Sequence, residues 1–210
     1  MENIRDFMKH AETIKLREPL AWTLGTFEDE NDIFEYSFID TIKMAGHSCP
    51  TVSAAYIGCL NTLKKLYPDS IPVRGEISVT VYGDAEEGVY GVIAQVFSFI
   101  TGACTNTGFK GLGSKFNRKD LLKFSPDTPD PQAMCFEFER LDNNEKILLK
   151  IHHGGLPSIG IKEQLMGELL KKTIMETAEK EEIREFQDLW MGKVEKIIKQ
   201  ENIEDWISVE

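Results

Sequence analysis

One junction constrains this chain more than any other feature: the run Ala45-Gly46-His47-Ser48-Cys49-Pro50 leads directly into a long helical pattern. Proline is favoured in the first turn of a helix because its missing N–H would have no partner there and its φ is already helical. Pro50 therefore predicts a helix that begins at this residue. The helix should end near residue 66, because Tyr67 precedes Pro68 and a residue before proline disfavours helix. One stripe of this helix is apolar and predicts burial: Val52, Tyr56, Cys59, Leu60 and Leu63.

The same junction places Cys49 at or beside the N-cap of the helix. Free backbone N–H groups and the positive end of the helix dipole stabilise an anion at this position, which favours the thiolate over the thiol. His47 lies two residues away, and neutral imidazole with thiolate is a ligand pair that suits zinc. The alternative is structural, with Cys49 as a small buried residue and His47 as a hydrogen-bonded loop histidine. These residues alone leave both interpretations open.

Composition excludes several classes of protein. A length of 210 residues, with 41% hydrophobic and 28% charged residues, fits one domain or one domain with an appendage. The net charge of −11 argues against a nucleic-acid partner, which normally meets a basic patch. No run approaches the roughly 18 to 20 apolar residues of a membrane span, and the first residues lack the pattern of a signal peptide. We therefore expect a cytoplasmic protein that does not bind a membrane.

The cysteines fall into two groups. Four cysteines without a CxxC pair do not make a disulfide framework or a zinc ribbon in a chain of this size. Cys59 and Cys135 lie on apolar stripes, which predicts that they are core residues. Cys49 lies at the start of the predicted helix over 50–66, and Cys104 lies in the loop that follows the predicted helix over 89–101.

The periodicity predicts both helices and strands, and hence an α+β protein. We expect one domain over residues 1–156, with a mixed or antiparallel sheet and a buried central helix. The expected elements are a short helix within 2–15, an extended segment over 33–42, strands at 76–82 and 121–124, a buried helix at 89–101, and a β-hairpin of 133–139 with 146–151.

Residues 157–210 change character and form a predicted C-terminal extension. Two apolar stripes at helical spacing follow Pro157, which predicts an antiparallel helical hairpin that packs on the core or on a second subunit. The small residues Ser53, Ala54 and Gly58 would also let another helix approach the central helix closely. A homodimer is therefore expected.

A glycine-rich stretch over residues 108–115 is similar to a phosphate-binding loop but differs in its spacing. Gly113 is followed by Ser-Lys instead of Lys-Ser/Thr, and the stretch follows a helix instead of a strand. The glycines more simply supply positive φ angles in a tight loop.

These motifs together resemble the FmdE family, relatives of the small E subunit associated with formylmethanofuran dehydrogenase. The resemblance covers about residues 30–125 and is sharpest at Gly46-His47-Ser48-Cys49-Pro50. Further matching segments are Gly83-Asp84-Ala85, Thr101-Gly102 and Gly108-Phe109-Lys110-Gly111-Leu112-Gly113.

The resemblance implies an α+β domain whose motif supplies zinc ligands. His47 and Cys49 match the motif directly, and Cys104, before Thr105, resembles a later family cysteine that would be the third ligand. The chain differs from many members in Ala45, Thr51 and Ala55. It also lacks the four-cysteine zinc ribbon found at the C-terminus of archaeal members, so it resembles a bacterial branch and is not implied to act in methanogenesis.

Three protein ligands would leave zinc an open fourth position, as in catalytic or exchangeable sites. Asp84, Glu86 and Glu87 are then candidates for a general base or for hydrogen bonding to ligands, or they simply stabilise a helix N-terminus. His152 or His153 would complete the site if the hairpin end folds over it; otherwise both are surface residues. Lys110 is a candidate for binding an anionic group of a substrate.

Three hypotheses of function follow, and whether the chain is an enzyme stays open. The first is a zinc protein whose open metal site binds or transforms an unknown small molecule. The second is a non-catalytic accessory or metal carrier that serves a molybdenum or tungsten oxidoreductase. The third is a redox or sensor protein that uses the Cys49 thiolate without a metal.

Overall fold

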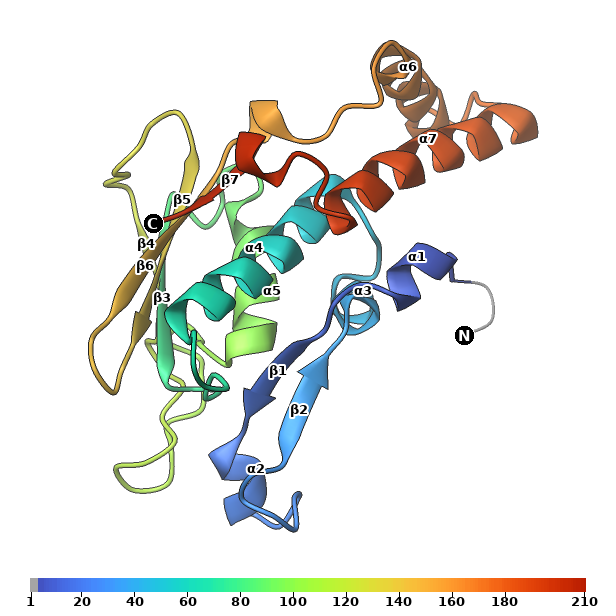
Figure 1. Cartoon of the computed structure of the whole chain (residues 1–210). Helices are drawn as coiled ribbons and strands as arrows, with labels where there is room; N and C mark the ends of the chain where they lie inside the picture. The colour runs from blue at the N-terminus through green and yellow to red at the C-terminus, as the bar shows by residue number, and fades with distance from the viewer. Residues whose placement is uncertain (1–3) are drawn as a thin grey trace.

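Helix α4 (Pro50–Leu66) forms the centre of the molecule and has the bounds that the sequence predicts (Figure 1). The structure is a computed structural model and describes residues 4–210. Nearly every side chain from Val52 to Leu63 is buried, because α4 packs against a sheet and against helices on its other sides. This confirms the central buried helix.

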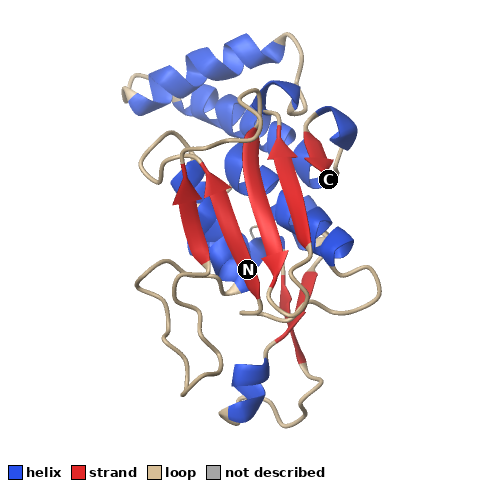
Figure 2. Ribbon diagram, turned by 90° about the vertical axis from the view of Figure 1, so that its left-hand side faces the viewer, coloured by secondary structure: helices blue, strands red, loops and turns tan. Residues whose placement is uncertain are grey.

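A five-stranded sheet packs on α4. Its order is β4-β3-β5-β6-β7, with β3 and β4 parallel and the other neighbours antiparallel. Helix α5 (Tyr90–Thr101) connects the parallel pair and lies with α4 on one face of the sheet (Figure 2). The strands are β3 (Ile77–Tyr82), β4 (Leu122–Ser125), β5 (Met134–Arg140), β6 (Lys146–Ile151) and β7 (Ile207–Val209). The predicted α+β class with a mixed sheet is therefore confirmed.

The core lies between the helices and the sheet. Phe97 of α5 makes edge-to-face contacts with Phe136 and Phe138 of β5, with ring centroids 5.2 and 5.0 Å apart. Gly58 of α4 faces β6 so closely that a Cβ would lie 2.9 Å from Cδ2 of Leu149. This small residue of α4 therefore serves packing on the sheet within the chain.

The N-terminal prediction is wrong beyond the first turn. Helix α1 covers only Asp6–Lys9, and residues 14–17 form strand β1 (Ile14–Arg17), which pairs with β2 (Ile33–Tyr36). Ile14 fits the end of the predicted helical stripe. However, Ile14 and Leu16 are both buried while Lys15 and Arg17 are exposed, which is the alternation of a strand paired with β2. Residues 2 and 3 of the predicted helix lie outside the described residues.

The predicted extended segment over 33–42 is also wrong in its second half. After β2 the chain forms helix α3 (Phe38–Ala45), which begins with a capping box. The Ser37 hydroxyl accepts from the Asp40 N–H, and the Asp40 carboxylate accepts from the Ser37 N–H. This reciprocal pair stabilises the first turn of α3 and overrides the alternating pattern. A short helix α2 (Pro19–Thr23) links β1 and β2.

The C-terminal helical hairpin is confirmed as α6 (Lys162–Ile174) and α7 (Lys180–Ile198), which project beyond the sheet (Figure 1). The chain then returns through a 3₁₀ turn (Ile203–Asp205) to strand β7, which pairs with β6 and which the sequence did not predict. Trp206 is fully buried beside it. None of the helices described over residues 4–210 combines the length and apolarity that a bilayer crossing requires.

Candidate metal centre

The loop Gly46–Cys49 joins the end of α3 to the start of α4. Gly46 ends α3 in the left-handed region with a φ of 75°, a conformation that glycine adopts without strain. Cys49 is extended and is the N-cap of α4, and its Sγ accepts a hydrogen bond from the Val52 N–H at 3.4 Å. The N-cap position predicted for Cys49 is confirmed.

One hydrogen bond holds the His47 ring. Its Nδ1 lies 3.0 Å from the Ala45 carbonyl oxygen, and a carbonyl can only accept, so Nδ1 carries the proton. The ring is exposed, and its Nε2 forms no hydrogen bond among the described residues. Histidines that bind metals usually donate their other ring N–H to a carbonyl or carboxylate in this way.

Cys49 is only 9% exposed, and several backbone groups fix its position. Its carbonyl accepts from the Ser53 N–H at 3.0 Å and from the Ser53 hydroxyl at 2.8 Å. The hydrogen bond from the Val52 N–H to Sγ shows that the thiol faces the first turn of α4.

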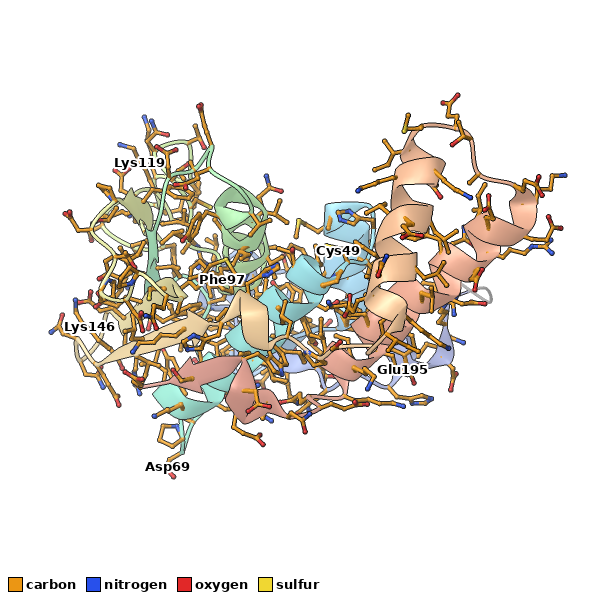
Figure 3. All side chains as sticks on the ribbon, turned by 90° about the horizontal axis from the view of Figure 1, so that it is seen from above. Cys49, Asp69, Phe97, Lys119, Lys146 and Glu195 are labelled. Carbon is orange, nitrogen blue, oxygen red and sulfur yellow. The ribbon has the colours of Figure 1, made fainter. Side chains whose placement is uncertain are left out.

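A tryptophan from the C-terminal hairpin contacts this loop. Trp190 Nε1 of α7 donates a hydrogen bond to the Ser48 carbonyl at 3.1 Å. Figure 3 shows Cys49 at the end of α4, on the side of the molecule toward α6 and α7. The sequence identifies Trp190 only as one residue of an apolar stripe, and 142 residues separate it from its partner, so no local pattern signals the contact.

Cys104 lies in a different setting, on the connection from α5 to β4. Its backbone is held on both sides: its N–H donates to the Arg118 carbonyl and its carbonyl accepts from the Leu122 N–H. Its Sγ donates to the Gly102 carbonyl at 3.4 Å and lies 3.8 Å from the Ser98 hydroxyl. The thiol is partly exposed and lines a cavity beside α5.

The three predicted zinc ligands lie on two different segments, with His47 and Cys49 before α4 and Cys104 after α5. Within residues 4–210, no three His, Cys, Asp or Glu side chains form a group that could hold a metal ion. His47 and Cys49 share one loop, but Cys104 does not join them in such a group. The predicted set of three zinc ligands therefore stays a prediction, and among the described residues only His47 and Cys49 of this set share a loop.

The predicted carboxylates lie on the surface. Asp84, Glu86 and Glu87 are exposed in the turn that precedes α5. Asp84 accepts from the Glu86 N–H at 2.9 Å, so its carboxylate stabilises its own turn. This bond does not reach α5, whose N-cap is Val89 and whose first turn holds no acidic residue, so it does not stabilise the N-terminus of the helix. Neither Glu86 nor Glu87 contributes a side-chain hydrogen bond among the described residues.

The remaining candidates are also at the surface. Lys110 and His153 are exposed, and His152 is partly buried after β6, where its N–H donates to the Trp206 carbonyl. None of the three joins a group of metal donors within the described residues. Cys59 and Cys135 are buried as predicted, and burial raises the pKa of the Cys59 thiol.

One buried cluster escaped the sequence-based interpretation. Glu18 accepts from Arg118 at 2.6 Å and from Arg74 at 3.0 Å. Arg74 also donates to the carbonyls of Phe99 and Ile100 at the end of α5. The partners are 56 and 100 residues from Glu18 along the chain, so spacing alone does not signal the cluster.

Comparisons with known proteins add no relative. No protein-family model matches the chain, and no curated protein matches it. The side chains and their geometry therefore carry the account of function.

Proposed function

We propose that this chain is a zinc-binding protein of the FmdE type that holds the metal through His47 and Cys49. The observation that supports this most directly is the His47 ring, which is exposed and donates Nδ1–H to Ala45 while its Nε2 remains free. The N-cap position of Cys49 supplies a second donor two residues away. Imidazole nitrogen and thiolate sulfur are both preferred zinc ligands.

Two ligands from one loop leave zinc with open coordination positions. Structural zinc sites are closed by four protein ligands, whereas open positions allow solvent or a small molecule to bind. An unknown small molecule is therefore the proposed ligand of the metal. The alternative of a metal carrier for an oxidoreductase rests on the same openness, because a weakly held ion exchanges readily.

A thiol-based function without a metal fits Cys104 better than Cys49. Cys49 is 9% exposed, whereas Cys104 is the only one of the four cysteines that is not classed as buried. A redox or sensor function without a metal would therefore use Cys104. Such a function predicts rapid, selective reaction of Cys104 with oxidants in metal-free protein.

The predicted homodimer remains a proposal. Helix α6 and its ends carry exposed apolar side chains, with Ile161 96% and both Ile174 and Met175 72% exposed. Apolar groups that gather on a projecting element often contact a partner. A molar mass of two chains in solution is the expected result.

The test is the zinc content of protein purified without a tag or chelator, measured by elemental mass spectrometry. About one zinc per chain is expected in the wild type. Cys49→Ser keeps an oxygen at the N-cap and so preserves the start of α4, but it removes the sulfur ligand and should lose the zinc. His47→Ala should lose it too.

The matched control is His153→Ala, which removes another exposed histidine and should keep the zinc. Wild-type protein that stays metal-free after incubation with zinc contradicts the proposal. Full zinc content in both Cys49→Ser and His47→Ala also contradicts it.

A further inference from the structure

A cavity of about 390 Å³ lies beside α5, away from the His47 loop. One face of α5 forms a wall through Gly91, Gln95 and Ser98. The loop after Cys104 and strand β4 form other sides, and the cavity opens to solvent where Gln95 and Thr107 are exposed. The complete lining is Ala85, Gly91, Ala94, Gln95, Ser98, Cys104, Thr105, Thr107, Gly108, Leu122 and Phe124.

No residue of this lining carries an acidic or basic side chain. The polar groups are one amide, three hydroxyls and one thiol, and the apolar part includes the partly exposed ring of Phe124. A charged ligand would lose hydration here without gaining an ion pair, which is costly. The cavity therefore selects for uncharged molecules.

Close backbone contacts fix the walls of the cavity. A Cβ at Gly91 would lie 2.8 Å from the Ala85 carbonyl oxygen, and a Cβ at Gly108 would lie 2.5 Å from the Cβ of Cys104. Both glycines thus allow approaches that no other residue permits without a shift. Together with the two backbone hydrogen bonds of Cys104, these contacts make the cavity preformed.

We propose that this cavity binds an uncharged small molecule with a flat ring and a carboxamide or lactam group. The Gln95 side chain offers a donor and an acceptor side by side, which complements an amide. Ser98, Thr105 and Thr107 add hydroxyls that can donate or accept, and Phe124 offers an aromatic ring for contact with a flat ligand. The volume is near the lower end for small-molecule sites, which suits one ring system.

This site is independent of the proposed metal site. Its lining includes neither His47 nor Cys49. The Cys104 thiol serves as a reporter, because the other three cysteines are buried and this one faces the cavity. Alkylation of the native protein should occur first at Cys104.

The experiment measures the rate of Cys104 alkylation by iodoacetamide, followed by intact mass, with nicotinamide as the probe. Nicotinate is the matched control, because it has the same ring but carries a negative charge. With a dissociation constant on the order of 1 mM, about 10 mM nicotinamide should slow alkylation about tenfold. Nicotinate should leave the rate unchanged, and Cys104→Ser should remove the labelled site.

A variant of the cavity distinguishes protection of Cys104 by bound nicotinamide from a general effect of nicotinamide on the protein. The Gln95 side chain is exposed at the mouth of the cavity, so Gln95→Glu should leave the fold intact. The variant adds a negative charge to the lining. This variant should lose protection by nicotinamide, measured as the ratio of its own alkylation rates with and without the probe, because a carboxylate in the lining also slows the basal reaction of the Cys104 thiolate. Equal protection by nicotinate, no protection by either probe, or unchanged protection in Gln95→Glu would overturn the proposal.

Discussion

At Glu18, one buried carboxylate holds two arginines from distant parts of the chain. The side chains of Glu18 and Arg118 are 5% and 6% exposed, and Arg74 is 24% exposed. The cluster has more positive than negative charge, and Arg118 Nη1 has no hydrogen-bond partner among the described residues. Burial is the largest effect on Arg118 and lowers the pKa of its guanidinium. The single negative charge of Glu18 therefore offsets the positive charges of both Arg74 and Arg118.

We expect Glu18→Gln to destabilise the fold by about 3–5 kcal/mol, because it leaves two arginines without their carboxylate. Urea unfolding, followed by circular dichroism, measures this change. Glu35→Gln is the matched control, since Glu35 pairs with Lys15 where both side chains are about half exposed. The control should change stability by less than about 1 kcal/mol. Equal effects of the two variants would contradict the role of Glu18.

At the scale of elements, α7 connects the C-terminal hairpin to the loop that starts α4. Trp190 donates to the Ser48 carbonyl, and Arg5 near α1 pairs with Asp188 of the same helix. The hairpin therefore does more than project into solvent. It fixes the backbone between the two donors His47 and Cys49.

Trp190→Phe keeps an aromatic ring but removes the N–H donor. We expect a loss of about 1 kcal/mol in stability and faster hydrogen exchange at the amides of residues 46–49. Trp206→Phe is the control, since Trp206 donates a similar bond to the Glu201 carbonyl elsewhere. After correction for any change in global stability, Trp206→Phe should show wild-type hydrogen exchange at residues 46–49. Loop exchange at the wild-type rate in Trp190→Phe would show that the bond does not order the loop.

At the scale of the whole molecule, several tyrosine and cysteine side chains are buried in their protonated, neutral form. Burial raises the pKa of Tyr67 to about 12, and it also raises the pKa values of Tyr56 and Cys59. The unfolded chain therefore releases these protons at lower pH than the folded protein. Stability should be complete below pH 9 and decrease as the pH rises toward 12, since the unfolded state then binds fewer protons.

Each fully buried group contributes a slope of up to about 1.4 kcal/mol per pH unit in this range. Urea midpoints measured between about pH 8 and 11 test the effect. Tyr67→Phe removes one ionisable group and should flatten the slope above pH 10. A wild-type urea midpoint that stays constant across this pH range would contradict the predicted loss of stability.

Local signals explain which parts of the fold the sequence could predict. Pro50 and the residue pair Tyr67-Pro68 set both ends of α4 from neighbouring residues alone, and the alternation over 76–82 did the same for β3. The Ser37–Asp40 capping box is also a local signal, and it overrides the alternation that predicts an extended segment over 33–42. These features lie within a few residues, where periodicity and capping act.

Features that depend on distant partners could not be predicted. Strand β7 exists because β6 offers it a free edge, and β1 exists because β2 pairs with it. The same limit applies to the candidate site. His47 and Cys49 share one loop because they are two residues apart in the sequence, whereas the position of Cys104 depends on how α5 and β4 pack.

The central claim is that zinc binds His47 and Cys49 without Cys104. The most direct test is zinc K-edge X-ray absorption on wild-type protein and Cys104→Ala, which counts sulfur neighbours at about 2.3 Å. The account predicts zinc in both proteins, with identical spectra and sulfur in the coordination shell of each. Loss of zinc or of a sulfur neighbour in Cys104→Ala would contradict it and make Cys104 a ligand.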